Sequence, residues 1–452
     1  MAGKQKMLVA GAGLSGTAAL KLIEDLDGEA LLYDMNADLD PAAALKKLEH
    51  PEKVKVVLGE LKEGDLEDVS ICVISPGIPL NSPFIRLLAR QKITVWSEIE
   101  LAYHCMRGKL VAITGTNGKT TTTALTGAIL RAIYPEVFVV GNIGEPFCAK
   151  VLETTGNSYT VAEVSSFQLE TTMDFRPDIS AILNITPDHL DRHGTFENYA
   201  AIKKFIADRQ RRDDFIVLNY DDPVLREWGE GSDLKPRTIF FSSTKELERG
   251  YYLDGELIIQ ADESGKSQVI NVREMNLLGR HNYENAMAAI AICAKLGVSM
   301  DIIHNVLKTF RGVEHRIEFV LERAGVKYFN DSKGTNPEAS IHAINAMPGP
   351  VLLIAGGYDK KSDYDKWVES FEGKVKYLVL IGATRDDIAR CANAHGFYEI
   401  MYAEDMSEAV RVCASYADVG DCVLLSPACA SWGMFKNFEE RGKVFKECVR
   451  AL

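Results

Sequence analysis

The stretch Leu-Val-Ala-Ile-Thr-Gly-Thr-Asn-Gly-Lys-Thr-Thr-Thr-Thr, residues 110–123, decides the fold of the chain around it. Its first four residues form an apolar run that suits a buried parallel strand. The glycine-containing turn that follows lets successive backbone N–H groups point at one anion. Lys119 can then reach the terminal phosphates, and Thr120 stands where a P-loop hydroxyl binds Mg²⁺. The pattern predicts an ATP site made by Gly115, Thr116, Asn117, Gly118, Lys119, Thr120 and Thr121.

This phosphate loop departs from the full G-x-x-x-x-G-K-[ST] pattern at one position, because Ile113 stands where the pattern has its first glycine. The alternative interpretation is a Thr-rich helix N-terminus that binds no ligand. The ATP site is favoured because a lysine and a threonine follow the loop immediately.

Composition limits the function classes open to the chain. A length of 452 residues suggests about three domains. The net charge of -13 argues against a nucleic-acid or anionic-membrane surface and leaves only local phosphate pockets. Nine scattered cysteines without a C-x-x-C pair indicate reduced thiols and a cytosolic protein. No apolar run reaches about 18 residues, so we expect no membrane span.

The first segment, residues 1–107, carries Gly-Ala-Gly-Leu-Ser-Gly at 11–16 between a predicted strand and a predicted helix. A second strand ends at Asp34, so the segment meets the dinucleotide fingerprint in glycine spacing and in its acidic residue. The fingerprint does not say which nucleotide binds, because Asp34 could hold a ribose of NAD or of another nucleotide. Ser75 begins a rigid turn after a further strand, which is either a ligand-binding strand end or an ordinary tight turn.

The second segment, residues 108–311, places Glu163 near the end of a strand at the same sheet edge as the phosphate loop. Mg²⁺ takes oxygen ligands, which Glu163 and Thr120 could supply together with ATP. His189 is either a satisfied loop histidine or part of the site, and it would be an unusual Mg²⁺ ligand. Beyond it, residues 199–211 predict a basic helix.

The third segment, residues 312–452, again places polar loops after apolar strands. The whole chain therefore predicts an α/β protein of three domains. The first and third domains are expected to be Rossmann-like, and the central one is expected to be P-loop ATPase-like with a mostly parallel sheet.

Four motifs together resemble the Mur ligases of peptidoglycan synthesis, over the full length of the chain. They are Thr-Gly-Thr-Asn-Gly-Lys-Thr at 114–120, Gly-Asn-Ile-Gly at 141–144, Asp-His-Leu-Asp-Arg-His at 188–193 and Asn-Asp-Ser-Lys at 330–333. Within that family, residues 163–170, 331–337 and 425–431 are similar to the member that adds D-glutamate. The resemblance implies an ATP-dependent amide ligase that joins D-glutamate to UDP-N-acetylmuramoyl-L-alanine through an acyl phosphate, with ADP and phosphate as products. It implies a cytoplasmic bacterial enzyme, which we expect to be a monomer without nucleic-acid or membrane partners.

The resemblance also assigns residues to three binding sets and one metal set. For the UDP-sugar, rather than NAD, it implies Gly13, Leu14, Ser15, Asp34, Ser75 and Asn142. For ATP it adds Asn282, Asn285, His315, Arg316 and Asp331 to the phosphate loop. For D-glutamate it implies Thr335, Lys360, Ser431 and Phe438, with Lys361 open as an alternative to Lys360. For Mg²⁺ it implies Thr120, Glu163, His189 and a carbamylated Lys203, and for catalysis Lys119, Glu163, His189 and Lys203.

The modified lysine needs a chemical reason. An ammonium group has three donors and no acceptor, so an unmodified Lys203 cannot bind a metal ion. Reaction of the neutral amine with CO₂ gives a carbamate, whose oxygens can bind a metal ion. This requires that burial or nearby charge lowers the pKa of the amine. From the residues alone, Lys203 is a solvated helix lysine, and the neighbouring Lys204 stays open as the modified residue.

Three other classes compete with this interpretation. A nicotinamide dehydrogenase explains residues 11–16 and leaves the phosphate loop without a role. A P-loop switch protein explains Lys119 and leaves the loop at 426–431 without one. A folylpolyglutamate synthetase, also an ATP-dependent glutamate ligase, explains the central and C-terminal segments but does not need an N-terminal domain that binds uridine.

Overall fold

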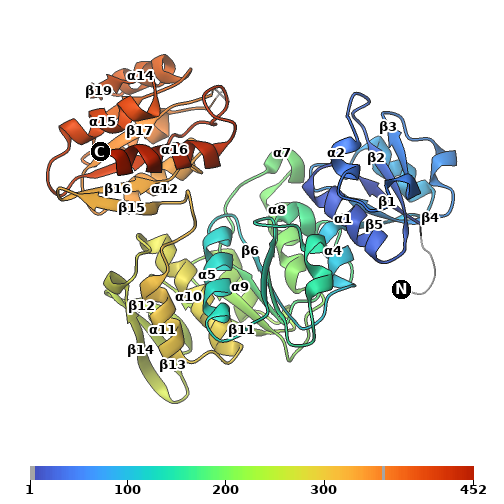
Figure 1. Cartoon of the computed structure of the whole chain (residues 1–452). Coiled ribbons are helices and arrows are strands. Elements are labelled where there is room, and N and C mark those ends of the chain that lie inside the picture. The colour runs from blue at the N-terminus through green and yellow to red at the C-terminus, as the bar shows by residue number, and fades with distance from the viewer. Residues whose placement is uncertain (1–5, 359–361) are drawn as a thin grey trace. The chain divides into compact units, whose positions relative to one another are not determined.

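The computed structural model describes residues 6–358 and 362–452. It contains three β-sheets with helices packed against them (Figure 1). Contacts divide the chain into two compact units, one of residues 1–270 and 284–306 and the other of residues 271–283 and 307–452. The α/β class with three sheets confirms the predicted fold class, whereas the domain boundaries after residues 107 and 311 stay a prediction.

The N-terminal sheet has the strand order β3-β2-β1-β4-β5, and all its strands are parallel. Its strands are β1 Lys6–Ala10, β2 Glu29–Asp34, β3 Val54–Leu58, β4 Val69–Ile74 and β5 Thr94–Ser97. Its helices are α1 Leu14–Asp25, α2 Ala42–Leu45, α3 Pro83–Arg90 and α4 Glu98–Tyr103. Leu20 of α1 packs with Val9 on one face, and Phe84 of α3 packs with Leu8 on the other. The three inner strands, β1, β2 and β4, are buried on both faces, as is usual for a parallel sheet.

The central sheet has nine strands in the order β14-β13-β12-β11-β10-β9-β6-β8-β7. They are β6 Lys109–Thr114, β7 Val137–Gly141, β8 Tyr159–Glu163, β9 Ile179–Ile182, β10 Phe215–Asn219, β11 Arg237–Ser242, β12 Gly250–Asp254, β13 Leu257–Asp262 and β14 Gly265–Asn271. The helices are α5 Lys119–Arg131, α6 Ser166–Leu169, α7 Leu190–His193, α8 Phe196–Lys204, α9 Pro223–Glu230, α10 Arg280–Lys295 and α11 Met300–Thr309. From β7 across the sheet to β12, each strand pairs in parallel with its neighbour, and β12 and β13 form an antiparallel hairpin.

The C-terminal sheet has the order β15-β16-β20-β17-β18-β19, with only β15 and β16 antiparallel. Its strands are β15 Glu318–Arg323, β16 Val326–Asn330, β17 Val351–Ala355, β18 Val375–Leu380, β19 Ile400–Tyr402 and β20 Cys422–Leu425. Its helices are α12 Pro337–Ala346, α13 Asp365–Glu369, α14 Arg385–Ala394, α15 Met406–Tyr416 and α16 Phe438–Ala451. Pro337 stands at the first position of α12, where the missing N–H of proline costs no hydrogen bond.

The predicted basic helix over residues 199–211 is wrong at both ends. Helix α8 starts at Phe196, where the Thr195 side chain accepts a hydrogen bond from the backbone N–H of Asn198. It ends at Lys204, after which residues 205–207 form a 3₁₀ turn that buries Ile206. An N-cap threonine and a buried turn therefore override the run of helix-forming residues.

Strand β14 lies at one edge of the central sheet and was missing from the sequence prediction. Its first four residues, Gly-Lys-Ser-Gln, are exposed, and only Val269 and Ile270 are buried. Lys266 forms an ion pair with Glu246. A strand that is half polar and begins with glycine lacks the alternating pattern that predicts strands.

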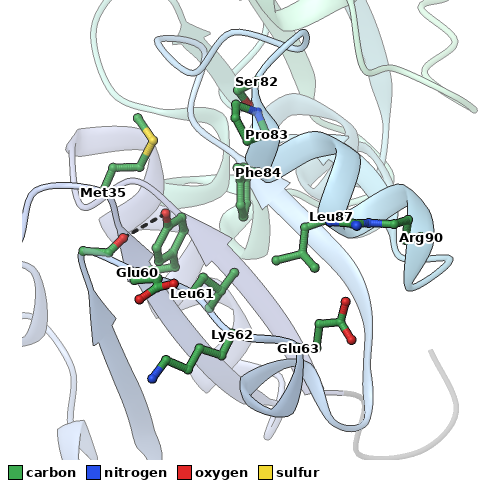
Figure 2. A pocket seen from close by; sticks show the side chains of 12 residues that line it. Met35, Glu60, Leu61, Lys62, Glu63, Ser82, Pro83, Phe84, Leu87 and Arg90 are labelled. Atoms are coloured by element: carbon green, nitrogen blue, oxygen red, sulfur yellow. Dashed lines mark hydrogen bonds between the residues drawn. The ribbon is translucent and has the colours of Figure 1, made fainter.

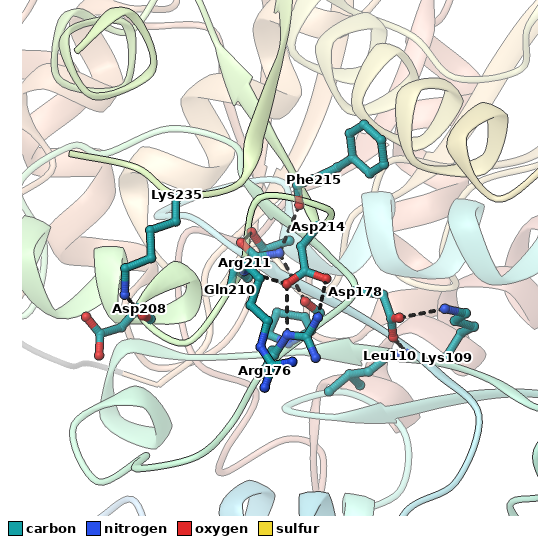
Figure 3. Close-up of polar contacts among 12 residues, drawn as sticks. Lys109, Leu110, Arg176, Asp178, Asp208, Gln210, Arg211, Asp214, Phe215 and Lys235 are labelled. Carbon is teal, nitrogen blue, oxygen red and sulfur yellow. Dashed lines mark hydrogen bonds and ion pairs between the residues drawn. The ribbon is translucent and has the colours of Figure 1, made fainter. Parts of the chain in front are cut away.

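Polar contacts hold together the end of the central sheet at which β6, β9 and β10 begin (Figure 3). Arg176 binds the nearly buried carboxylate of Asp214 through Nε and Nη2, at 2.8 and 2.9 Å. Asp178 accepts hydrogen bonds from the Lys109 ammonium and from the backbone N–H of Leu110. These contacts set where the strands start, and hence where their far ends place the phosphate loop.

Among residues 6–358 and 362–452, no helix combines the length and the apolar character needed to cross a bilayer.

We predict that Asp214→Ala lowers the free energy of unfolding by about 2–4 kcal/mol, because it leaves the Arg176 guanidinium half-buried without its bidentate partner. Urea unfolding followed by circular dichroism measures the change. Asp208→Ala, at a carboxylate exposed on the same side of the sheet, serves as the control and should stay within about 0.5 kcal/mol of the parent. Equal stability of the two variants would contradict the role given to Asp214.

Candidate active site

The phosphate loop joins β6 to α5, and two glycines allow its shape. Gly115 has φ +149° and Gly118 has φ +83°, conformations that other residues rarely adopt. A Cβ at Gly118 would also overlap the side-chain oxygen of Asn285. The Asn184 side chain fixes the middle of the loop, because its oxygen accepts a hydrogen bond from the backbone N–H of Asn117 at 2.8 Å. The backbone N–H groups at the start of α5 then form an anion-binding helix N-terminus.

Two lysine ammonium groups meet at the carbonyl oxygen of Gly115. Lys119 Nζ donates to it at 2.9 Å and to the carbonyl of Thr116 at 2.8 Å. Lys203 Nζ donates to the same Gly115 oxygen at 2.8 Å and lies 3.4 Å from the hydroxyl of Thr114. Burial of Lys203 and the nearby charge of Lys119 hold the pKa of Lys203 well below its usual value. The predicted catalytic lysines therefore share one end of the loop.

Glu163 ends β8 directly beside β6, where it pairs with Ile113. Its carboxylate is almost fully buried. One carboxylate oxygen accepts a hydrogen bond from the Asn142 amide at 2.8 Å, while the other has no hydrogen-bond partner among the residues described. A buried carboxylate oxygen without a partner is costly unless a cation binds it. The position of Glu163 at the strand edge of the phosphate loop thus fits a Mg²⁺ ligand.

His189 occupies a left-handed backbone conformation with φ +51° at the start of α7. About half of its side chain is exposed, and its ring lies 4.8 Å from the ring of Phe167. Its Nε2 lies 3.5 Å from an Asp188 carboxylate oxygen. An exposed imidazole can turn toward a ligand, so the assignment of His189 to the metal set stays a prediction.

Arg192, three residues beyond His189, connects α7 to two other segments. Its guanidinium donates to the backbone carbonyls of Pro76 and Ile78, at 2.5 and 3.2 Å. It also binds Glu170 and lies 4.1 Å above the Phe167 ring. The turn that follows Ser75 is therefore attached to the helix that carries the histidine motif.

The glycine-rich loop of the N-terminal sheet is braced by Asp34. The Asp34 carboxylate accepts hydrogen bonds from the backbone N–H groups of Ala12 and Asn36, each at 3.0 Å. A Cβ at Gly16 would overlap the carbonyl oxygen of Gly11, so α1 can pack this close only with glycine there. Gly13 and Leu14 are exposed at the start of α1, and Ser15 is half-buried. Ser75 Oγ lies 3.5 Å from the Gly11 carbonyl, which brings the two predicted loops together.

A cavity of about 650 Å³ lies beside the N-terminal sheet (Figure 2). It is bounded by the segment that follows β3 on one side and by helix α3 on the other. Phe84 and Leu87 of α3 point toward Leu61, and the Tyr33 hydroxyl donates to the carbonyl of Gly59 at 3.2 Å. The cavity includes Met35, the residue after Asp34. None of the six residues predicted to bind a UDP-sugar lines it, so the cavity and that prediction concern different surfaces.

The second unit contains a buried ionic cluster centred on Asp331, which follows β16. One Asp331 oxygen accepts a hydrogen bond from the Ser426 hydroxyl at 2.7 Å, and the other accepts one from the backbone N–H of Ile317 at 3.2 Å. Burial raises the pKa of Asp331 to about 7. Arg441 is also buried and donates to the Ser332 hydroxyl, the Ser332 carbonyl and the Cys429 carbonyl. Burial lowers the pKa of Arg441 to about 10.

Other predicted residues of this unit surround the cluster. His315 is buried, its Nδ1 lies 2.9 Å from the Asn330 amide, and its ring meets that of Phe438 edge-on at 6.0 Å. The Arg316 Nε is buried without a hydrogen-bond partner in the described part of the chain. Ser431 is buried, Thr335 is half-buried, and Lys360 and Lys361 lie outside the described residues.

Helix α10 carries the remaining two residues of the predicted ATP set. Asn285 belongs to the first unit and lies within 3.3 Å of the Thr122 hydroxyl at the start of α5. Asn282 belongs to the second unit and donates to the carbonyl of Leu278 at 2.8 Å. The structure therefore brings Asn285 to the phosphate loop, and its contact with ATP stays a prediction.

Several residues of these sites were not singled out from the sequence. Tyr199 places its hydroxyl 3.1 Å from that of Thr116 and its ring 4.8 Å from Lys203 Nζ. Asn184 was visible as a polar residue at the end of a predicted strand, and Arg192 stood within the motif at 188–193 without a role of its own. Arg441 lies on α16 and carried no local signal.

Known families and relatives match almost the whole chain. A family model of the Mur ligase middle domain matches residues 113–293, a model of the Mur ligase glutamate ligase domain matches 315–429, and one of the MurD-like N-terminal domain matches 5–97. A protein named UDP-N-acetylmuramoylalanine–D-glutamate ligase in Lachnoclostridium phytofermentans is 50% identical, over 99% of this chain and 98% of its own. The protein of that name in Lachnospira eligens is 49% identical over the same shares.

The chain belongs to the Mur ligase family.

Solved structures of Mur ligases share the fold with this member. The UDP-N-acetylmuramate-alanine ligase of Thermotoga maritima has a TM-score of 0.60 at 16% identity, and the alignment covers 99% of both chains. A pseudomurein peptide ligase type C of Methanothermus fervidus has a TM-score of 0.58 at 19% identity, again over 99% of both. At such identities the likeness concerns the fold alone.

We predict that Asp331 makes the stability of this Mur ligase pH-dependent. Its pKa is about 7 when folded and near 3.8 when unfolded, so the folded chain binds a proton that the unfolded chain has lost between about pH 4 and 7. Stability therefore falls as the pH rises through this window. Relative to Asp331→Asn, the parent should lose roughly 1–4 kcal/mol between pH 4 and 8, measured by urea unfolding. The exposed Asp386→Asn should keep the parent's slope; a parallel slope for Asp331→Asn would refute the prediction.

Proposed function

We propose that this Mur ligase joins D-glutamate to UDP-N-acetylmuramoyl-L-alanine in an ATP-dependent reaction of peptidoglycan precursor synthesis. The observation that carries the proposal is the similarity, at close to half of all positions and along almost the whole chain, to proteins named for this activity. The reaction releases ADP and phosphate. Because it consumes ATP, we place it in the bacterial cytoplasm, and we propose that the enzyme acts as a monomer.

The chemistry requires activation of the acceptor. The carboxylate of UDP-N-acetylmuramoyl-L-alanine is a poor acyl donor because it lacks a good leaving group. Transfer of the ATP γ-phosphate to it makes an acyl phosphate, from which phosphate can leave. The amine of D-glutamate then attacks the acyl carbon, the C–N bond forms, phosphate leaves and the amine loses a proton to solvent. In phosphoryl transfer the protein mainly positions groups and neutralises charge.

The phosphate loop supplies the positioning of ATP. The N–H groups at the start of α5 bind phosphate oxygens. Lys119, whose ammonium donates to the carbonyls of Gly115 and Thr116 in the structure, neutralises the transferred phosphate. Asn285 lies against the same loop and is proposed to contact the nucleotide. The resemblance to the family also assigns Asn282, Arg316 and Asp331 to the nucleotide.

Four residues are proposed to hold Mg²⁺: Thr120, Glu163, His189 and a modified Lys203. The support for a metal here is the buried Glu163 oxygen that lacks a hydrogen-bond partner within the described chain. When bound, Mg²⁺ neutralises the negative charge of the phosphates. Asn142 orients the Glu163 carboxylate through its hydrogen bond, besides its proposed contact with the UDP-sugar.

Carbamylation of Lys203 is supported by its position. The amine is buried at the end of the phosphate loop, beside Thr114 and Gly115, where an anion would lie next to Lys119. The lowered pKa favours the neutral amine, which forms a bond from nitrogen to the carbon of CO₂ and releases one proton. Lys204 is the weaker candidate because it is half exposed and lies 5.2 Å from the Trp228 ring.

The N-terminal and C-terminal domains are proposed to bind the two substrates that are joined. Gly13, Leu14, Ser15, Asp34 and Ser75 contact the UDP-sugar at the start of α1. Thr335, Ser431, Phe438 and Lys360 contact D-glutamate. The family models at 5–97, 113–293 and 315–429 support the proposed boundaries after residues 107 and 311.

We expect ADP release only when ATP, Mg²⁺, UDP-N-acetylmuramoyl-L-alanine and D-glutamate are all present, because activation and amine attack need all four. A coupled ADP assay measures it, with L-glutamate as the matched comparison. Equal turnover of L-glutamate and D-glutamate would overturn the substrate assignment.

We expect Lys119→Ala to lower kcat by roughly 10²- to 10³-fold, since it removes a charge that acts on the transferred phosphate. Binding of the UDP-sugar, measured by calorimetry, should not change. Lys150→Ala, at a lysine paired with Glu145 and Glu153, is the control and should retain the parent's rate. A Lys119 variant with a near-normal rate would mean that the phosphate loop has another role.

We expect Lys203→Ala to lose most of the activity and the adjacent Lys204→Ala to keep it. A small added carboxylate should partly restore the Lys203 variant, because it supplies the missing oxygens. A crystal grown near pH 8 with nucleotide and Mg²⁺ should show extra density on Lys203 Nζ; an unmodified side chain there, or a fully active Lys203→Ala enzyme, would sink the carbamate proposal.

A further inference from the structure

Asp365, Cys391 and His395 form a compact cluster in the C-terminal unit, and the proposed reaction uses none of them. Asp365 is the first residue of α13. Cys391 lies on α14, and His395 follows as the residue that caps this helix. Residues four apart on a helix lie on the same face, so the thiol and the imidazole point toward the same neighbouring helix.

The three side chains already lie at the spacing of metal ligands. His395 Nε2 is 3.1 Å and Cys391 Sγ is 3.3 Å from the same oxygen of Asp365. All three potential ligand atoms lie within 4.8 Å of one another. Ligands around a tetrahedral Zn²⁺, with bonds of about 2.0–2.3 Å, are separated by roughly 3.3–3.8 Å. Little movement is therefore needed for a metal ion to replace the two hydrogen bonds.

A fourth side chain carries a carboxylate near the second ring nitrogen, where metal-binding histidines usually have a hydrogen-bond partner. Glu369 Oε1, one helical turn beyond Asp365, lies 3.9 Å from His395 Nδ1. This distance is that of an ion pair and not of a hydrogen bond; a closer approach of the carboxylate to Nδ1 would fix the tautomer in which Nε2 can bind a metal ion. Cys391 is half-buried, about 28% of His395 is exposed and Asp365 is mostly exposed, so an ion can reach the cluster from solvent.

Two other His-containing clusters in the described chain differ, because other groups already engage their carboxylates. Glu100, beside His104, accepts hydrogen bonds from the backbone N–H groups at 173, 174 and 175. Glu314 and Glu318, beside His315, bind the Lys446 ammonium at 2.6 and 3.0 Å. Only the cluster at Asp365 adds a thiol to the histidine and the carboxylate.

We propose that Asp365, Cys391 and His395 bind one Zn²⁺, a site separate from the Mg²⁺ proposed beside the phosphate loop. A set of one sulfur, one nitrogen and one oxygen suits Zn²⁺ and not Mg²⁺, which takes oxygen ligands. Binding converts the Cys391 thiol to a thiolate, forms the S–Zn bond and releases one proton to solvent. Three protein ligands leave a fourth position for water, and the ion connects α13 to α14.

Co²⁺ in place of Zn²⁺ tests the site on the full-length enzyme with Mg²⁺ in excess. A thiolate-to-cobalt charge-transfer band in the near ultraviolet reports a cysteine ligand, and no cysteine belongs to the proposed Mg²⁺ set. We expect one equivalent of Co²⁺ to give the band, and one equivalent of Zn²⁺ to remove it. Cys391→Ser should lose the band, while Cys448→Ser, at a half-buried cysteine of α16, should keep it.

Glu369→Gln provides a second measurement that leaves all three ligands in place. Zn²⁺ affinity, measured by competition with a chromophoric chelator, should fall about 10- to 100-fold. Glu372→Gln, at an exposed position just beyond α13, should bind as the parent does. Absence of the charge-transfer band, its survival in Cys391→Ser, or an unchanged affinity of Glu369→Gln would each overturn the proposed site.

Discussion

The carbonyl oxygen of Gly115 accepts hydrogen bonds from two lysines, Lys119 and Lys203, and the catalytic half of the structure depends on this arrangement. Two ammonium groups so close would repel each other, and because Lys203 is buried, water would screen little of that repulsion, so the Lys203 amine is favoured in its neutral form. Negative charge at this point, from phosphates or from a carbamate, turns the repulsion into attraction. The start of α5 and the buried Glu163 of β8 lie at the same edge because parallel strands end together.

In the second unit, buried charged groups are surrounded by hydrogen-bonding groups of the protein. Asp331 and Arg441 are both buried, and hydroxyl, carbonyl and backbone N–H groups surround them instead of water. Ser332 contacts the Arg441 guanidinium through both its hydroxyl and its carbonyl, and the hydroxyl also donates to the Phe438 carbonyl. Such a network holds the residues after β16 at the N-terminus of α16. Buried polar groups that are fully engaged specify one arrangement of a loop.

Much of the fold could be predicted because strand ends carry their own chemical signals. Gly11 to Gly16, Gly115 to Lys119 and Glu163 each follow or end an apolar run, so pattern and spacing were enough. The contacts of Arg192 and Arg441 could not be found this way, since each side chain binds segments that are distant in sequence. The end of α8 depended on a buried turn at Ile206, and β14 lacked a strand pattern because half of it faces water. Local signals predict elements, whereas long-range partners require the folded chain.

The polar strand β14 has a consequence for how the protein behaves at high concentration. An edge strand presents unpaired backbone N–H and C=O groups, onto which a second chain can add a strand of its own. Here that edge begins with a glycine, and the ion-paired Lys266 lies next along the strand. Adding a neighbour would strip water from that charge, so growth of the nine-stranded sheet by edge-to-edge association is disfavoured. The exposed half of β14 thus disfavours aggregation at this edge of the nine-stranded sheet.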